Sequence, residues 1–346
     1  MARREHYNFG VQVAVGRNVF SWRPRVSVVI PAYNVAEYIG ETLESATAQR
    51  FKDHEILVVN DGSPDTPQLE RAIRPFLQNI VYLKQPGLGA GAARNTGIKH
   101  ARGEIIALLD GDDVWLPDFL ASQITFLGKG YDMVYCDAYQ FGMRSALRQT
   151  FMETAPSDGE VDAAALLDFR CNVITSGTVA NKVALIRAGL FEQERTLAHD
   201  FHLWVRMAKT GARIGYQRKQ LLKYRVHLAS LSGDSVNRVK REIDVFKRIR
   251  ETIQLNATET AILEKRLAGL EADLHVEHGK AFLLNEEFQN AYDSFVAANV
   301  HRHSFKLTAI GWLTRLAPRV MLNHYRNRRG GEIAFVPTQN PKRRSL

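Results

Sequence analysis

The alternation of apolar and polar positions in the first third of the chain predicts strands separated by helices. Four short apolar runs rich in β-branched residues have the composition of buried strands. They are VSVVI at 26–30, EILVVN at 55–60, IVYLK at 80–84 and EIIALL at 104–109. Helical patterns lie between them, and Ser63-Pro64 fits the cap and first residue of one helix. This alternation predicts an α/β fold, a mostly parallel sheet flanked by helices, which binds ligands at the carboxyl ends of its strands.

Farther along the chain, strand and helix patterns mix until residue 235, after which helical periodicity dominates. Strands are expected at 131–137 and 221–226, and helices at 161–169, 182–188 and 199–209. GKAFLL and FQNAYDSFVAA, within 271–298, predict two short helices that resemble one tetratricopeptide-like hairpin. We therefore expect an N-terminal arm at 1–24, which is basic and aperiodic, an α/β domain at 25–234, and a helical C-terminal region at 235–346 with a basic tail.

Composition narrows the class of protein. The chain has 346 residues, 45% of them hydrophobic and 24% charged, as in soluble globular proteins. We expect no membrane-spanning run and no secretory signal in MARREHYNFG. Two cysteines, Cys136 and Cys171, exclude a disulfide framework and fit the cytoplasm.

The net charge of +9 is concentrated at the C-terminal end. Residues 301–346 hold ten Lys and Arg against one acid, Glu332, and so carry +9 by themselves. Such a tail predicts an anionic partner, here a membrane surface at the inner face of the cell membrane. Nucleic acid is not expected, because no basic, aromatic-rich binding fold accompanies the tail.

Residues 305–326 have the pattern of an interfacial helix, which Pro318 should divide into two. Apolar residues fall on one side and arginines on the other. The apolar set is Phe305, Ala309, Trp312, Leu313, Leu316 and Val320, and the basic set is Arg315, Arg319 and Arg326, followed by Arg328, Arg329, Lys342, Arg343 and Arg344. The alternative is that the apolar side packs on the α/β domain.

Each of the first three predicted strands is followed by residues suited to a ligand. Pro31-Ala32-Tyr33-Asn34 is a turn or a loop with an aromatic ring for base stacking, and Asp61 shapes a turn or accepts a nucleobase N–H. The stretch 87–95 runs from glycines into a helix, whose amides and dipole suit phosphate, with Arg94 as a cation. A dinucleotide fingerprint through Gly87, Gly89, Ala92 and Asp110 is the rival, although Gln85-Pro86 separates the strand from the glycines.

The fourth strand is followed by Asp110-Gly111-Asp112-Asp113. In a continuing strand Asp110 and Asp112 point to the same side and could bind Mg²⁺ or Mn²⁺, whereas Asp113 faces away and could cap the turn before Trp115. One alternative is an acidic turn without a metal. Another is the aspartyl-phosphate motif of haloacid-dehalogenase-like phosphatases, with Asp110 as nucleophile, although that family carries the motif on its first strand.

Several segments together resemble family-2 inverting glycosyltransferases of the GT-A fold, over residues 25–233. They are VSVVIPAYN, EILVVNDGS, GAARNTGIKHARGEIIALLDGDD, HDFHLWVRM and YRVHLASLS, in the expected order. The resemblance implies that residues 25–234 are the catalytic domain. It implies nucleoside contacts from Pro31, Ala32, Tyr33 and Asp61, a diphosphate contact from Arg94, and a metal-associated DxD pair of Asp110 and Asp112, with Asp110 also toward the nucleotide.

His199-Asp200 occupies the place of that family's Glu-Asp pair. Asp200 shares a helical face with Leu203, Trp204 and Met207 and lies in the first turn, where the dipole favours a carboxylate. By itself it could be an ordinary first-turn acid, and the resemblance implies a general base. His199 departs from the pattern, and a role on the acceptor side is expected for it and for Trp204; a His199/His202 metal pair is weak at that spacing.

His227 follows the strand expected at 221–226, in a segment like the family's closing loop. It is a third metal ligand, a diphosphate contact or a surface histidine.

The function expected from these features is that of a metal-dependent inverting glycosyltransferase, hexosyltransferase-like. It would move a sugar from a nucleotide donor, UDP-linked by preference, to an acceptor hydroxyl in surface polysaccharide or glycolipid assembly. Two alternatives stay open, a phosphatase that uses Asp110 and a non-catalytic nucleotide-sugar-binding scaffold.

Overall fold

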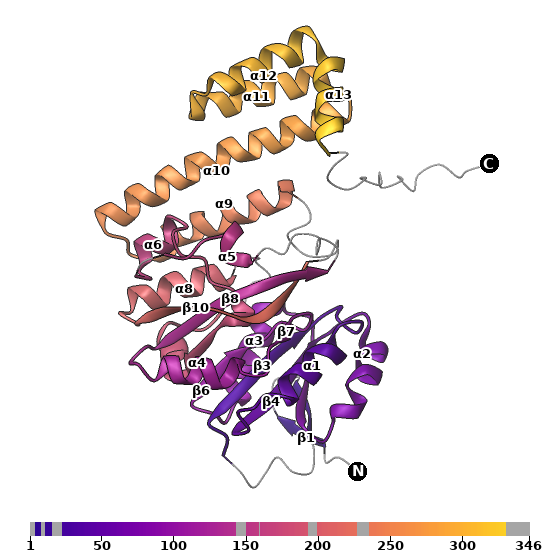
Figure 1. Cartoon of the computed structure of the whole chain (residues 1–346), viewed down its shortest axis with the longest axis vertical. Helices are drawn as coiled ribbons and strands as arrows, with labels where there is room; N and C mark the ends of the chain where they lie inside the picture. Colours follow the sequence, from indigo (N-terminus) through magenta and orange to yellow (C-terminus); the bar gives the residue numbers. More distant parts are fainter. Residues whose placement is uncertain are drawn as a thin grey trace, which may run out of the picture. The chain divides into compact units, whose positions relative to one another are not determined.

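A computed structural model describes residues 4–7, 11–15, 23–142, 150–158, 160–192, 199–226 and 235–329 (Figure 1). The chain divides into two compact units. The first is Met1–Gly233 with Asp244–Arg266, and the second is Asp234–Ile243 with Leu267–Leu346. The boundaries expected from the sequence, after residues 24 and 234, stay predictions.

The first unit is built on one mixed sheet with the order β1-β2-β5-β4-β3-β6-β9-β8-β10-β7. Its strands are β1 (Arg4–Tyr7), β2 (Val11–Val15), β3 (Val26–Ala32), β4 (His54–Asp61), β5 (Ile80–Gln85), β6 (Ile105–Leu108), β7 (Val114–Trp115), β8 (Met133–Gly142), β9 (Val179–Asn181) and β10 (Ile214–Val226). β3 pairs in parallel with β4 and β6, β4 with β5, and β8 with β10. The other pairs, such as β6–β9 and β8–β9, are antiparallel. The α/β architecture expected from the sequence is confirmed.

Helices cover both faces of this sheet. They are α1 (Ile39–Thr47), α2 (Thr66–Ile73), α3 (Ala90–His100), α4 (Phe119–Leu127), α5 (Phe151–Thr154), α6 (Ala163–Leu167), α7 (Lys182–Arg187) and α8 (His199–Lys209), with 3-10 turns η1 (Arg74–Phe76) and η2 (Thr175–Gly177). Val26, Val28 and Ile30 of β3 lie in one core with residues of α1, α2 and α4. Val29 points to the other face, toward α3, where a Cβ at Gly97 would lie 2.4 Å from Val29 Cγ1. Only glycine allows α3 to approach the sheet so closely.

Alternation along β3 therefore distributes its apolar side chains to two cores. Because both faces are covered, the strand is apolar at nearly every position, as the sequence pattern indicated.

Three sequence expectations differ from the structure in the first unit. The segment expected to be a loose arm contains β1 and β2, and β2 pairs antiparallel with β5, because the edge of β5 offers unpaired backbone groups. β10 begins at Ile214 rather than at residue 221. α2 begins at Thr66, after Asp65, so Ser63-Pro64 lies ahead of the helix. The Ser63 hydroxyl instead accepts a hydrogen bond from Asn34 N at 2.6 Å and donates one to Asp65.

The second unit is helical. α9 (Ser235–Thr252) and α10 (Ala257–Leu284) each contribute residues to both units, and α11 (Phe288–Arg302), α12 (Phe305–Leu316) and α13 (Pro318–Arg329) follow. Leu283, Ala291, Phe295 and Leu322 form its core. GKAFLL is the end of α10 rather than a short helix, because Gly279 is a packing contact against the Phe295 ring and not a break.

The predicted division at Pro318 is confirmed, since α12 ends at Leu316 and Pro318 opens α13. Over the described residues, none of the helices combines the length and the apolar character that crossing a bilayer requires.

Candidate active site

The segment Asp110–Asp113 forms a tight turn at the carboxyl end of β6. The strand ends at Leu108, and Asp113 N donates to Asp110 O at 3.2 Å. Asp110 and Asp112 thus do not alternate along a continuing strand, and that expectation is wrong. Gly111 lets the turn pass close to β3, since a Cβ there would lie 3.1 Å from Pro31 O. Thr42 of α1 holds the turn through a 3.0 Å hydrogen bond to Gly111 O.

Asp110 is held by two partners below the turn. Arg94 of α3 donates to its carboxylate, and Asp110 N donates to Ser176 Oγ at 3.1 Å. The Arg94 side chain is buried, and its guanidinium lies 5.5 Å from the centre of the Phe191 ring. Arg94, expected to meet a diphosphate, therefore contacts the first acid of the DxD pair; the diphosphate contact itself stays a prediction.

Asp113 is buried beside two other acids, so its charged form is destabilised. Its Oδ1 accepts from Arg225 N at 2.8 Å, and its Oδ2 has no hydrogen-bond partner among the described residues. Burial, Asp112 and Asp110 raise the pKa of Asp113 well above its ordinary value. The expected cap before Trp115 is wrong, because Trp115 N donates to Ser45 Oγ instead.

Arg225, near the end of β10, ties the acidic turn to α1. Its Nε donates to Asp112 O at 2.7 Å, and its guanidinium pairs with Glu41. The same guanidinium lies between two rings, 4.8 Å from the centre of Tyr38 and 4.3 Å from that of Phe141. Arg225 thereby fixes the backbone of the DxD turn.

The Tyr224 hydroxyl is buried, and the charges of four carboxylates act on it. Burial raises the pKa of Tyr224, and the negative charges of Asp113, Asp110, Asp112 and Asp200 raise it further. Asp200 of α8 and the acidic turn after β6 therefore act on the same hydroxyl, although they are far apart in the sequence. We call these four residues the acid cluster.

Asp200 is oriented within the acid cluster by its neighbours. Thr175 Oγ1 donates to Asp200 Oδ2 at 2.9 Å, and Phe201 N donates to Oδ1 at 2.9 Å. Thr175 belongs to η2, and the next residue, Ser176, binds Asp110 N and accepts from Trp115 Nε1 at 2.7 Å. η2 therefore sets the position of Asp200 relative to Asp110.

The acid cluster fits a hard divalent cation by its chemistry, because its donors are carboxylate oxygens, which such cations prefer. Asp110 and Asp112 are the residues that would hold such a cation. In the described part of the chain, no group of three or more His, Cys, Asp or Glu side chains is arranged to hold a metal by itself. A bound diphosphate would have to supply further oxygen ligands.

The residues expected at the nucleoside lie at the ends of β3 and β4. Pro31 is half-buried, Ala32 is buried and Tyr33 is 58% exposed, so its ring is accessible for stacking. Asp61 is buried and accepts three hydrogen bonds, from Gln85 Nε2 at 2.7 Å, Leu88 N at 2.9 Å and Gly89 N at 2.7 Å.

These contacts change the interpretation of the glycine-rich loop. The amides of Leu88 and Gly89, expected to be available to phosphate, are bound to the Asp61 carboxylate. The loop is folded onto the end of β4, and this also argues against a dinucleotide fingerprint, which needs those amides free.

The remaining predicted site residues lie apart or outside the description. Trp204 is buried, with its ring centre 5.9 Å from that of Phe191, so it belongs to the core and its acceptor role stays a prediction. His202 is buried and uses both ring nitrogens, at 2.9 Å from Thr252 Oγ1 and 3.1 Å from Arg206 Nε, which removes it from any metal pair. The side chain of His199 and all of His227 lie outside the described residues.

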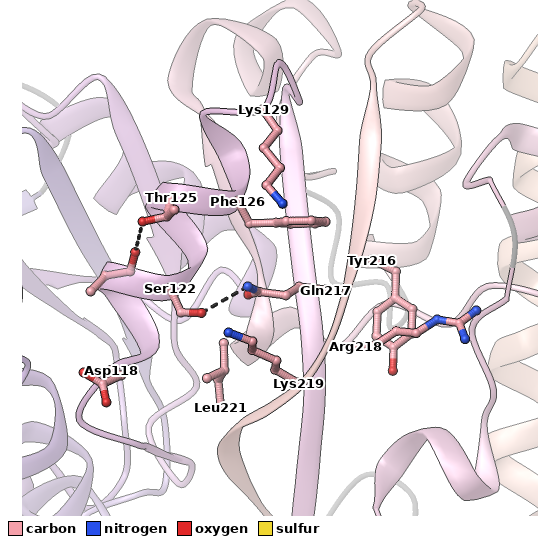
Figure 2. Close-up of a pocket in the computed structure, with 11 residues that line it drawn as sticks. Asp118, Ser122, Thr125, Phe126, Lys129, Tyr216, Gln217, Arg218, Lys219 and Leu221 are labelled. Carbon is pink, nitrogen blue, oxygen red and sulfur yellow. Dashed lines mark hydrogen bonds between the residues drawn. The ribbon is translucent and has the colours of Figure 1, made fainter.

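A groove of about 720 Å³ lies between α4 and β10 (Figure 2). It is lined by polar and aromatic side chains, among them Ser122, Phe126, Lys129 and Gln217, and Gln217 Nε2 donates to Ser122 Oγ at 3.0 Å. None of the acid cluster lines this groove, so it is not part of the candidate site.

Sequence reasoning missed several residues of the site. Arg225 entered the sequence analysis only as part of the segment YRVHLASLS, without a role of its own. Thr175 and Ser176 could not be singled out, because a Thr-Ser pair is common in loops. Asp113 could be identified in the sequence as part of Asp110–Asp113, but its hydrogen bond from Arg225 N could not be predicted.

Comparisons with known proteins show which family this chain resembles. The family model for glycosyl transferase family 2 matches residues 27–186. An uncharacterized glycosyltransferase of Rickettsia prowazekii is 30% identical over 239 residues, which cover 66% of this chain and 72% of that protein. The UDP-Glc:alpha-D-GlcNAc-diphosphoundecaprenol beta-1,3-glucosyltransferase WfaP of Escherichia coli is 28% identical over 228 residues, 65% of this chain and 86% of WfaP.

Solved structures show the same fold. A mannosyltransferase from Pyrobaculum calidifontis, in complex with GDP-Man and Mn²⁺, superposes with a TM-score of 0.58 at 21% identity, over 89% of this chain and 83% of that one. Residues 1–349 of TarS from S. aureus, in complex with UDP, superpose with a TM-score of 0.54 at 22% identity, over 90% and 94%.

Proposed function

The chain belongs to glycosyl transferase family 2, and on that basis we propose that it transfers a sugar from a nucleotide-sugar donor to an acceptor hydroxyl with inversion at the anomeric carbon. We propose a UDP-linked hexose as donor and a surface polysaccharide or glycolipid intermediate as acceptor. The name of WfaP, which has a UDP-Glc donor and a diphosphoundecaprenol-linked acceptor, supports this choice. The GDP-Man complex of the mannosyltransferase shows that the fold also accepts another base.

The observation that carries the proposal is the link between Asp200 and Asp110 through η2. Thr175 donates to the Asp200 carboxylate, and the next residue, Ser176, accepts from Asp110 N, so a candidate base and the first acid of the DxD pair are held by adjacent residues. The carboxylates of Asp110 and Asp112 would hold Mg²⁺ or Mn²⁺, which neutralises charge on the diphosphate when bound. The Mn²⁺ in the mannosyltransferase complex is consistent with this.

Asp200 is proposed as the general base. It accepts the proton of the acceptor hydroxyl as the hydroxyl oxygen attacks the anomeric carbon, and the bond to the diphosphate breaks in the same displacement. The Thr175 hydroxyl and the Phe201 amide, each 2.9 Å from a carboxylate oxygen, fix its direction. No covalent sugar–enzyme intermediate forms in this scheme.

The other proposed roles follow the positions of the side chains. Arg94 holds Asp110 in place, and Tyr33 stacks on the base. In its nucleoside role, the Asp61 carboxylate accepts a hydrogen bond from the base in addition to those from Gln85, Leu88 and Gly89. Each carboxylate oxygen can accept more than one hydrogen bond. His199 and Trp204 on the acceptor side and His227 as a further ligand remain part of the proposal.

Family membership favours sugar transfer over the phosphatase alternative. The scaffold alternative predicts nucleotide binding without transfer. Binding and transfer are therefore tested separately.

The binding test is a thermal-shift comparison of UDP and GDP with and without Mn²⁺. We expect UDP to raise the melting temperature more with Mn²⁺ than without it, because a ligand that binds only the folded state stabilises it. Asp112→Asn should lose the Mn²⁺-dependent part, whereas Asp158→Asn, at an exposed ion pair with Arg218, should keep it. An Asp112→Asn protein that keeps the full Mn²⁺ effect excludes Asp112 as a metal ligand.

The transfer test uses Asp200→Asn, in which the amide keeps the shape and cannot accept the proton. UDP binding should be unchanged, and transfer to a lipid-linked acceptor extract should fall by about 10²–10⁴-fold. The anomeric configuration of the product, measured by NMR, tests inversion. Wild-type protein that binds UDP and transfers to none of the acceptors supports the scaffold.

A further inference from the structure

α12 is a helix whose apolar side faces away from its own unit. Its buried residues are Leu307, Gly311 and Thr314, two of which have little apolar surface. The large apolar side chains are exposed instead. They are Phe305 at 95%, Leu316 at 75%, Trp312 at 53% and Leu313 at 48%.

These exposed side chains form one continuous stripe. Relative to Phe305, the positions of Ala309, Trp312, Leu313 and Leu316 are four, seven, eight and eleven residues along, which is the spacing of one helical face. Val320, in the first turn of α13, is 65% exposed. We call the set from Phe305 to Leu316 the α12 stripe. Exposed apolar patches of this kind on a soluble unit mark a surface that another body covers.

Contacts within the unit hold the stripe outward. At the corner between α11 and α12, Ser304 N donates to Asn299 Oδ1 at 2.7 Å, and Asn299 Nδ2 donates to Thr308 Oγ1 at 2.8 Å. On the other edge of α12, the Arg315 guanidinium lies 5.3 Å from the centre of the Tyr292 ring of α11. α12 cannot rotate its apolar side inward without breaking these contacts.

A groove next to the stripe enlarges the apolar surface. It holds about 320 Å³ between α11 and α12, and Val296, Val300 and Trp312 line it. Val296 and Val300 are themselves 44% and 64% exposed. The groove is open and apolar, and it shares Trp312 with the stripe.

The charges on α12 and α13 have one sign. On a helical wheel, Lys306 and Arg315 fall on either side of the stripe, and Arg319 follows on α13, whereas Arg326 pairs with Glu286. Residues 294–331 contain no Asp or Glu. Long basic side chains beside an apolar face can extend their charges to lipid headgroups while their stems stay in the apolar layer.

We propose that the α12 stripe docks on an anionic lipid bilayer, with α12 lying in the plane of the interface and its apolar side chains inserted. Trp312 suits the boundary between headgroups and acyl chains. A second copy of this chain is a poorer occupant, since a symmetric contact would place the same basic residues against each other. The proposal is independent of the transfer chemistry.

The test is co-sedimentation of the full-length protein with vesicles of phosphatidylcholine alone or mixed with phosphatidylglycerol. Binding should require phosphatidylglycerol and should weaken as salt rises, because each basic residue near the surface is attracted by the anionic lipid. The variant Phe305→Glu with Leu316→Glu should bind at least about tenfold more weakly, since two large apolar side chains no longer insert.

Two matched controls separate insertion from other effects. Phe305→Leu with Leu316→Phe keeps both positions apolar and should bind like wild type. Val183→Glu replaces a side chain that is 66% exposed on α7 in the other unit, and it should also bind like wild type. Because these positions are exposed, all variants should fold, which unchanged UDP-dependent melting would verify.

Three outcomes would overturn the proposal. They are absence of binding to either vesicle, equal binding to both compositions, and equal binding by wild type and the double glutamate variant. If wild type fails to bind vesicles, a dimer by light scattering that the glutamate variant disrupts would identify a second copy as the occupant.

Discussion

His202 should make the first unit lose stability as the pH falls, and His202→Gln should remove that dependence. The side chain is 2% exposed on α8, two residues after Asp200, and its ring bridges Arg206 and Thr252 of α9. Burial, followed by the positive charges of Arg206 and Arg248, lowers the pKa of His202 to about 4. The histidine is therefore neutral in the folded protein at neutral pH.

The sign follows from the two pKa values. The unfolded histidine titrates near 6.5, and the folded one near 4. Between these two pH values the unfolded state binds a proton at His202 and the folded state does not. The contribution of neutral His202 to the unfolding free energy is therefore complete above pH 6.5 and is lost as the pH falls toward 4.

Lowering the pKa of His202 from 6.5 to about 4 corresponds to about 3 kcal/mol of unfolding free energy. This is an upper bound, because the Glu192 carboxylate lies 3.4 Å from Nδ1 and would stabilise an imidazolium.

The assay is urea unfolding of wild type and His202→Gln, each in a background that carries Trp22→Phe and Trp312→Phe. Fluorescence then reports on Trp115 and Trp204, which are buried in the first unit. Carboxylates also titrate in this range, so the informative quantity is the difference in unfolding free energy between the two proteins. That difference should shrink by up to about 3 kcal/mol between about pH 7.5 and pH 4.

A difference between wild type and His202→Gln that stays constant over this range would refute the reasoning. It would mean that the folded protein accommodates the imidazolium, for instance through Glu192.

Three further predictions concern the site and the core. Arg225→Ala should lower transfer at least about tenfold by freeing the DxD turn, with a smaller loss from Glu41→Gln, as measured by initial rates at saturating donor. Gly97→Ala should lower the unfolding free energy by about 1–3 kcal/mol, because the added methyl overlaps Val29, and urea unfolding checks it. Asp113→Asn should raise the melting temperature of the metal-free protein, and the increase should be larger at pH 8 than at pH 5. The raised pKa of Asp113 means that its charged form destabilises the fold. An unchanged melting temperature at both pH values would count against this destabilising charge.

The central strands of the sheet could be predicted from the pattern of apolar side chains. β3 and β4 are apolar on both faces because helices cover both, and this is visible in VSVVI and EILVVN. The N-terminal hairpin could not be predicted, because β2 is stabilised by pairing with β5, about 70 residues away, rather than by its own sequence. GKAFLL was misjudged because a glycine that packs against a ring looks like a helix break in sequence.

The candidate site divides in the same way. Asp110 and Asp112 could be proposed because they follow a buried strand, and Asp200 because the family resemblance adds to its place in the first turn of an amphipathic helix. The structure links Asp110 and Asp200 through Ser176 and Thr175. The partners of Arg94 and Asp61 were not predictable, since both are chosen by contacts between distant segments. Arg225 lies 112 positions from Asp113, and no local pattern reports such a contact.

The hydrogen bonds from Gln85, Leu88 and Gly89 to Asp61 have a consequence for how fast a ligand can bind. These hydrogen bonds form without a ligand, so the loop at residues 87–89 does not have to become ordered when a nucleotide binds. A nucleotide should then associate in one step, with an observed rate that rises linearly with its concentration and does not level off. Differences in affinity among nucleotides should appear in how long each stays bound.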